Sequence, residues 1–211
     1  MNKIILIGKD GLGASLEHPP TGLVVEWLGE RACLKIGDGC RFRNCKFQIA
    51  SDDLIEIGSN SNVSNLYIRC AASLSQVKIG QHFIISSGEF ILPSGGTRQS
   101  IVIGDECLFS SHIAIFTSDG HSILDKETGR VLNNKGGHVR VGNHCWIGYR
   151  TLFTKLASVA DGSIVGANSL VCKSFLKESC LIVGQPAIVQ QENINWSIQN
   201  PSIYKENHNE N

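Results

Sequence analysis

The sequence predicts an all-β fold in which the chain winds as a three-sided parallel β-helix. Two spacings predict this fold. A hydrophobic residue recurs every six positions from Val141 to Val171, and the motif apolar–any–apolar–Gly recurs five times between Leu34 and Gly142. A period of six fits neither an α-helix, which repeats every 3.6 residues, nor a strand, which alternates every two. It fits a chain that turns a corner every six residues, so that three sides close one coil.

The first segment, residues 1–33, is predicted to cap one end of the helix. The apolar run that ends at Gly8 is a predicted strand, and Gly11-Leu12-Gly13 follows it. This arrangement weakly resembles a dinucleotide-binding turn, which requires a helix directly afterwards. His18-Pro19-Pro20 excludes a helix there. A capping strand is therefore the favoured interpretation.

Residues 34–176 are predicted to form the stacked coils. The third residues of the five motifs stand at positions 36, 57, 79, 103 and 141, and Val159 continues the series, so the steps are 21, 22, 24, 38 and 18 residues. The steps of 21, 22 and 24 residues are slightly longer than the shortest step of 18, which predicts short insertions at corners. The one large excess predicts a protruding loop over residues 117–138. Stacked coils should place the motifs side by side, about 4.8 Å apart.

The eight cysteines do not indicate disulfides or zinc. Cys40, Cys107 and Cys145 each lie four residues after a coil-opening apolar residue, where other sides carry Ser, Thr or Ala, and the chain has no Cys-x-x-Cys pair. We expect them to be small inward-facing fillers with free thiols, as in a reducing compartment.

Composition narrows the classes of function. The 211 residues fit one domain, and 19 basic and 19 acidic residues leave no net charge. No basic stripe indicates nucleic-acid binding. Neither a signal peptide nor an apolar run of membrane-spanning length is found, so we expect a cytoplasmic protein without a membrane span.

The long loop carries the candidate catalytic residue. Loops longer than about 12–15 residues within a compact domain tend to be functional. This loop contains Asp119-Gly120-His121 and then a Lys126–Gly129 turn that predicts a hairpin. A neutral imidazole can act as a general base, so His121 is the candidate. Asp119 is a candidate to orient His121, and a structural role in the Asp-Gly turn is an equal alternative.

Residues 177–211 are predicted to form a short C-terminal segment. From about Gln190 the segment is polar, with Trp196 as an expected anchor. The last residues, Lys205–Asn211, are expected to fray.

Several motifs in the second half of the chain together resemble one known family. They are Asn143-His144-Cys145-Trp146-Ile147-Gly148, Lys173-Ser174-Phe175, Gly184-Gln185-Pro186-Ala187 and Glu192-Asn193-Ile194 before Trp196. With the loop histidine and the six-residue repeat, they resemble the hexapeptide-repeat acyltransferases, in particular the bacterial polysialic-acid and capsule O-acetyltransferases. The resemblance implies a left-handed β-helix and direct transfer of acetyl from acetyl-CoA to a hydroxyl of a bacterial surface glycan. It also implies a homotrimer with active sites between subunits.

The resemblance further implies roles for individual residues. His121 matches the general base, and Trp146 matches a residue that donates to the oxyanion or packs against the pantetheine arm. No metal is implied. The residues that match the acetyl-CoA track are Trp146, Gly148, Tyr149, Ala167, Cys172, Lys173, Arg150 and Lys155, the last three as candidates for contact with a phosphate. Cys172 stands where relatives have Thr or an aromatic residue, which is a departure from the family.

Three alternatives remain open at this stage. The acceptor could be an amino sugar, an antibiotic or serine. The chain could be a non-catalytic scaffold of the same fold. Zinc carbonic anhydrases also share the architecture, but they need three converging histidines. Here His138 and His144 are six residues apart, which places them on adjacent sides.

Overall fold

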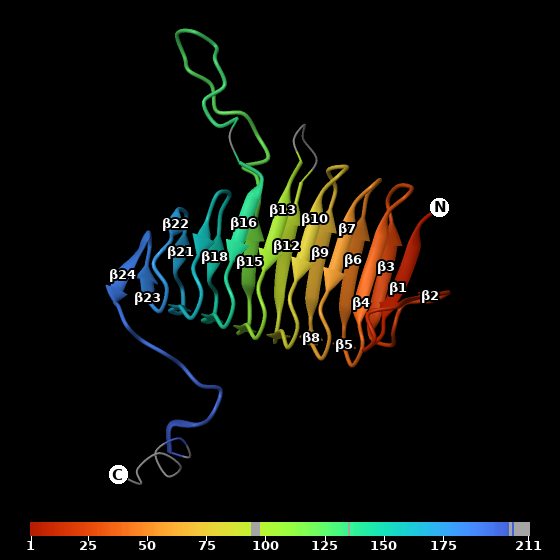
Figure 1. Ribbon diagram of the computed structural model, residues 1–211. Helices are drawn as coiled ribbons and strands as arrows, with labels where there is room; N and C mark the ends of the chain where they lie inside the picture. Colours follow the sequence, from red (N-terminus) through yellow and green to blue (C-terminus); the bar gives the residue numbers. More distant parts are fainter. Residues whose placement is uncertain (94–97, 135, 203, 205–211) are drawn as a thin grey trace.

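In the computed structural model the chain folds as the predicted all-β parallel β-helix (Figure 1). The structure describes residues 1–93, 98–134, 136–202 and 204; the expected fraying of Lys205–Asn211 lies outside them. Three sheets form the faces of a long prism, and the chain visits them in a fixed order that we call face A, face C and face B. One coil is thus β4 on face A, β5 on face C and β6 on face B.

Each face is a stack of short strands. In spatial order, face A contains β2 (Gly13–Leu16), β1 (Lys3–Ile7), β4 (Cys33–Gly37), β7 (Leu54–Ile57), β10 (Gln76–Ile79), β13 (Ser100–Ile103), β16 (His138–Val141), β19 (Ser158–Val159) and β22 (Ser174–Phe175). Face C contains β24 (Ala187–Gln191), β23 (Leu181–Gly184), β20 (Ile164–Val165), β17 (Trp146–Ile147), β14 (Leu108–Phe109), β11 (Ile84–Ile85), β8 (Asn62–Ser64) and β5 (Arg41–Arg43). Face B contains β21 (Leu170–Val171), β18 (Leu152–Phe153), β15 (Ile113–Phe116), β12 (Gly88–Leu92), β9 (Leu66–Cys70), β6 (Cys45–Ile49) and β3 (Leu23–Trp27).

The strand register confirms both spacings that predicted the fold. The third residues of the coil-opening motifs, with Val159, form one row on face A, paired in the order Ile36, Ile57, Ile79, Ile103, Val141, Val159. The six-residue series visits the three faces in turn, since Ile147 pairs with Val165 on face C and Phe153 pairs with Val171 on face B. The N-terminal residues extend the stack, because β1 pairs in parallel with β4 and β2 folds back against β1.

The core is a narrow column along the axis of the prism. The inward-facing residue of almost every strand is buried, and Phe83 and Phe109 meet edge to face with ring centroids 5.1 Å apart. Cys107 and Cys145 are buried in the same column, as predicted. The Cys107 thiol donates to the carbonyl of Gly142 over 3.1 Å, and the Cys145 thiol donates to the carbonyl of Ala160 over 3.3 Å. These cysteines are small core fillers that hydrogen-bond the neighbouring coil.

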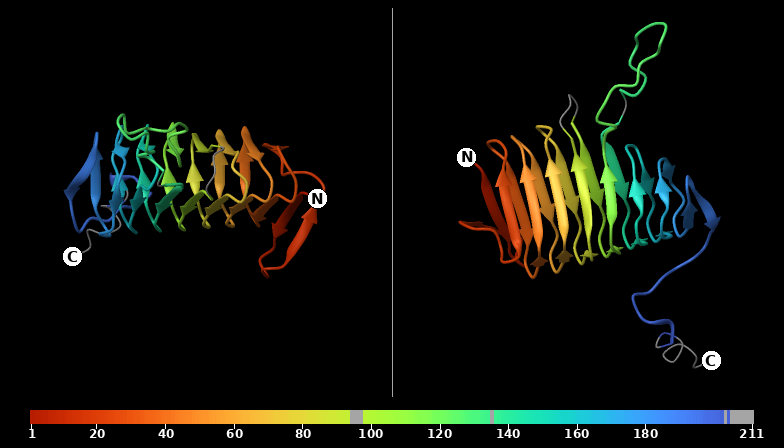
Figure 2. Two further views of the ribbon diagram at one scale, coloured as in Figure 1. Left: turned by 90° about the horizontal axis from the view of Figure 1, so that it is seen from above. Right: turned by 180° about the vertical axis from the view of Figure 1, so that it is seen from behind.

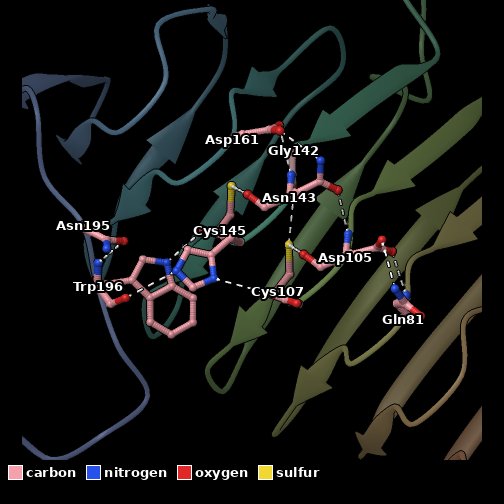
Figure 3. Close-up of polar contacts among 11 residues, drawn as sticks. Gln81, Asp105, Cys107, Gly142, Asn143, Cys145, Asp161, Asn195 and Trp196 are labelled. Atoms are coloured by element: carbon pink, nitrogen blue, oxygen red, sulfur yellow. Dashed lines mark hydrogen bonds and ion pairs between the residues drawn. The ribbon is translucent and has the colours of Figure 1, made fainter.

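The corners explain why glycine closes the coil-opening motif. A Cβ added to Gly142 would lie 2.6 Å from the backbone nitrogen of Asp161 in the next coil, closer than real Cβ atoms approach. Next to this glycine, Asn143 and Asp161 link successive coils. The Asn143 amide oxygen accepts from the Asp105 nitrogen over 2.9 Å, and the Asp161 carboxylate accepts from the Asn143 nitrogen over 3.0 Å (Figure 3). The backbones stack too closely for any side chain but hydrogen at this position.

Two segments leave the prism. The long loop follows β15 and ends where β16 begins at His138, so it arises at the corner between faces B and A, within the predicted range. After β24 the C-terminal segment leaves on the opposite side of the prism (Figures 1 and 2). The stack continues past residue 176, where the sequence placed its end, because β23 pairs with β20 on face C. Among the described residues, no helix is long and apolar enough to cross a membrane.

Candidate active site

The base of the long loop is held by one lysine from the next coil. The Lys155 ammonium lies 2.5 Å from the Asp119 carboxylate and donates to the carbonyl of Asn133 over 3.1 Å. Asp119 is on the outgoing arm of the loop and Asn133 is on the returning arm. The lysine and the Asn133 amide hold the pKa of the Asp119 carboxyl below its ordinary range. Lys155 was a candidate for contact with a phosphate of coenzyme A, and in this structure its ammonium is engaged at the loop base.

Asn133 also positions the backbone around His121. Its amide nitrogen donates to the Asp119 carboxylate over 2.7 Å and to the His121 carbonyl over 2.8 Å, while its amide oxygen accepts from the Ile123 nitrogen over 2.8 Å. The His121 side chain itself is exposed and makes no hydrogen bond within the part of the chain that the structure describes. Asp119 therefore does not orient the imidazole directly; it belongs to the network that shapes the loop.

Beyond His121 the loop is a hairpin, as its turn sequence predicted. Leu124 and Val131 form an antiparallel bridge, and the Asp125 nitrogen donates to the carbonyl of Arg130 over 2.8 Å. The hairpin projects well away from the prism (Figure 1).

Trp146 lies on face C, at the outward position that the repeat predicts. Its side chain is 40% exposed and its neighbours on the same face are Leu108 and Ile164. Face C is opposite the corner from which the loop arises, so His121 and Trp146 do not meet within one chain. A site that uses both residues requires a second subunit.

The C-terminal segment (residues 192–202) returns to face C next to Trp146. The Trp196 indole N–H donates to the carbonyl of His144 over 2.8 Å, and the two rings stack with centroids 4.6 Å apart and planes 16° apart (Figure 3). The expected anchoring role of Trp196 is confirmed. The ring centroids of Trp146 and Trp196 are 6.1 Å apart.

The remaining predicted residues fall at two different corners. Four lie between faces C and B: Gly148, Tyr149, Arg150 and Ala167. The Tyr149 ring meets His112 edge to face at 5.4 Å, and the Arg150 guanidinium lies 6.0 Å from the Tyr149 ring. Tyr149, Arg150 and Ala167 are exposed, whereas Gly148 is buried under the next coil.

Cys172 and Lys173 lie at the other corner, between faces B and A, one coil beyond Lys155. Both are exposed, and the Lys173 ammonium lies 5.4 Å from the centre of the Phe175 ring. The predicted acetyl-CoA track is therefore not one continuous surface of a single chain. Its residues lie on face C, where Trp146 stands, and at two edges of the prism that face B separates.

Sequence reasoning missed the roles of Asn133 and His144. Asn133 stands fourteen residues after its partner Asp119, and His144 stands fifty-two residues before Trp196. Neither spacing belongs to the repeat, so the six-residue pattern carried no signal for these contacts. The one hint was the isolated tryptophan in a polar C-terminal segment.

The histidines do not converge in the described part of the chain. His138 lies on face A, where its Nδ1 is 2.9 Å from the Ser100 hydroxyl, while His144 lies at the corner between faces A and C. No group of three or more His, Cys, Asp or Glu side chains among the described residues is placed to hold a metal ion.

Comparisons with known proteins agree with this architecture. The chain is 27% identical over 170 residues to a polysialic acid O-acetyltransferase of Neisseria meningitidis, covering 80% of this chain and 77% of that protein. The chain is similar to the polysialic acid O-acetyltransferases. A second one, from Escherichia coli O1:K1 / APEC, is 26% identical over 143 residues, covering 68% of this chain but 44% of that protein. No protein-family profile matches the chain.

The solved structure of the polySia-specific acetyltransferase NeuO has the same fold. It superimposes with a TM-score of 0.79 at 21% identity, covering 97% of this chain and 87% of that one. The resemblance found in the sequence is thus confirmed. Both relatives and this structural neighbour are acetyltransferases, which is the enzyme class that the sequence predicts.

Proposed function

We propose that this protein transfers an acetyl group from acetyl-CoA to a hydroxyl of a bacterial surface glycan, with polysialic acid as the first candidate acceptor. The observation that carries the proposal is the similarity to a polysialic acid O-acetyltransferase over 80% of the chain. The cytoplasmic location expected from the sequence stays a prediction.

The chemistry assigns a task to His121. A sugar hydroxyl is a weak nucleophile at neutral pH, and a neutral imidazole that removes its proton during attack on the thioester contributes about 10²–10⁴-fold. The exposed, unengaged His121 side chain is available for this task. The thioester oxygen gains negative charge during the attack, and the indole N–H of Trp146 is the proposed donor to it. Coenzyme A leaves as the thiol, and the acetyl group stays on the sugar oxygen.

The placement of these two residues supports a homotrimer. The loop that carries His121 projects from the corner between faces B and A (Figure 1), and Trp146 lies on face C, so an imidazole from one subunit can serve the face of another. Cyclic homo-oligomers build such shared sites with one repeated contact. The exposed cations Arg150 and Lys173 are the proposed partners of the phosphates of coenzyme A.

The test offers acetyl-CoA with polysialic acid, monomeric sialic acid, an amino sugar or an uncharged glycan, and follows thiol release. Because Cys172 is exposed and consumes thiol reagents, the enzyme is kept at catalytic amounts and acetylation is checked by mass spectrometry of the glycan. We expect release that depends on polysialic acid. Release only with the amino sugar would indicate an N-acetyltransferase. No acceptor-dependent release would contradict the proposal.

Replacing His121 tests the mechanism. His121→Ala should lower turnover by at least about 10²-fold, because the proton then has no acceptor. The matched control is His18→Ala, an exposed histidine of the cap, which should keep wild-type turnover. Turnover of His121→Ala near the wild-type value would remove His121 from the mechanism.

A further inference from the structure

The C-terminal segment builds a pocket on face C, and of its lining residues only Trp146 has a catalytic role assigned above. Trp146 and Ile164 form its floor, and Asn195, Trp196, Gln199 and Tyr204 are among the residues of its wall. Its volume is about 400 Å³. This size lies within the range of small-molecule sites, about 300–1,000 Å³. We call it the face-C pocket.

The wall of this pocket is held in place by Trp196 and His144. Besides the stacked rings and the indole hydrogen bond, the His144 Nε2 lies 3.3 Å from the Trp196 carbonyl, and its Nδ1 lies 3.7 Å from the Glu106 carboxylate. His144 is a corner residue with a φ of 49°. In this left-handed conformation its ring stacks on Trp196 of the returning segment. The face-C pocket is thus a built feature and not an accidental crossing of a loose terminus.

The lining combines exposed aromatic faces with neutral polar groups. Trp146 is 40% exposed and Tyr204 is 42% exposed, which is unusual for large aromatic side chains that share one depression. The amides of Asn195 and Gln199 and the hydroxyl of Ser197 surround them. None of the described residues that line the pocket is charged.

This chemistry fits a sugar ring better than any other part of the two substrates. A pyranose presents an apolar face of C–H groups, which stacks on an aromatic ring, and a rim of hydroxyls, which bond to amides. The phosphates of coenzyme A require cations, and none of the lining residues that the structure describes is one. We propose that the face-C pocket binds one sugar unit of the acceptor glycan, with Trp196 as a specificity-determining residue. This inference rests on the proposed acetyl transfer to a glycan.

The first experiment measures binding without catalysis. The chain has three tryptophans, of which Trp146 and Trp196 line the pocket and Trp27 lies in the cap. In a Trp27→Phe background the indole fluorescence therefore reports on the pocket. We expect a saturable change on titration with a short polysialic acid oligomer. The change should persist in about 0.5 M salt, because screening weakens only charged contacts. No change, or one abolished by salt, would overturn the proposal.

The second experiment uses two variants that disturb the wall differently. Trp196→Leu removes the ring, and His144→Asn removes the stacking partner while keeping a residue that tolerates the left-handed backbone. Both should raise the KM for the glycan about tenfold, while the KM for acetyl-CoA stays within about twofold. Trp27→Phe is the control and should change neither value. Thermal midpoints of all variants establish that the fold is intact.

The outcomes separate this inference from the proposed function. If the wild type acetylates the glycan and both variants keep its KM, the face-C pocket is not a sugar site and the proposed function stands. If no glycan is acetylated but the oligomer changes the fluorescence and Trp196→Leu abolishes that change, the pocket binds sugar and the proposed function fails.

Discussion

Asp53 makes the stability of this β-helix depend on pH in an unusual direction. It is a carboxylate in the wall of the core and is 1% exposed. One oxygen accepts from the Ser75 nitrogen over 2.7 Å and the other from the Ala50 nitrogen over 3.1 Å, so the side chain bridges two coils. These bonds lower the pKa, but burial outweighs them and raises it from 3.8 to about 6.

The sign of the effect follows from where the proton binds more tightly. Between pH 3.8 and about 6 the folded chain keeps the proton on Asp53 and the unfolded chain has lost it. The free energy of unfolding therefore falls as the pH rises through this window and levels off above it. A shift of about two pKa units corresponds to about 3 kcal/mol, most of which, about 2 kcal/mol, is lost between about pH 4 and 7.

The assay compares urea unfolding of the wild type and Asp53→Asn at several pH values between about 4 and 7. The variant cannot titrate at this position, so its stability relative to the wild type should improve by about 2 kcal/mol across the range. The control is Asp52→Asn. Asp52 pairs with Arg31 at 2.7 Å and has a lowered pKa, so this variant should not gain stability relative to the wild type as the pH rises. Parallel stability curves for the wild type and Asp53→Asn would refute the reasoning.

Three further predictions test the register, the corners and the loop base. Val165→Asp places an unpaired charge at a fully buried position and should abolish cooperative unfolding. The control Ser158→Asp, at an outward position, should shift the free energy of unfolding by no more than about 0.5 kcal/mol. A Val165→Asp variant that melts cooperatively would contradict the register. Gly148→Ala puts a Cβ 2.7 Å from the Ala167 nitrogen and should cost about 1–3 kcal/mol in a denaturation experiment, and an unchanged midpoint would mean that the coils separate easily. Lys155→Met releases both arms of the loop and should speed tryptic cleavage of the hairpin; cleavage at the wild-type rate would show that the ion pair does not hold the loop.

The fold could be predicted in detail because the repeat is local. Each coil contacts only the coils before and after it, so a spacing along the chain translates directly into a position in the stack. The rows from Ile36 to Val159 follow from counting residues. The same counting located the loop and placed Trp146 outward. It missed the extension by β23 and β24, because the spacing from Val171 onward departs from six.

The candidate site was only partly predictable. His121 was chosen from its place in the one long interruption, and its role as the base stays a prediction; the structure shows that its side chain is exposed. The ion pair between Lys155 and Asp119 was not predictable, since a lysine near a corner has the same pattern whether it faces a phosphate or an aspartate. Asn133 and His144 act through partners outside the repeat.

Three features could be read from the sequence alone: the winding of the chain, the face on which each repeat residue lies and the origin of the loop. These are consequences of a period that repeats along one axis. The three-dimensional contacts were needed to show that the loop carrying His121 and the residue Trp146 lie on opposite sides of one prism, that Lys155 holds the loop, and that Trp196 closes a pocket over face C. Those contacts join segments that leave the periodic wall, and their geometry depends on side-chain directions that no spacing encodes.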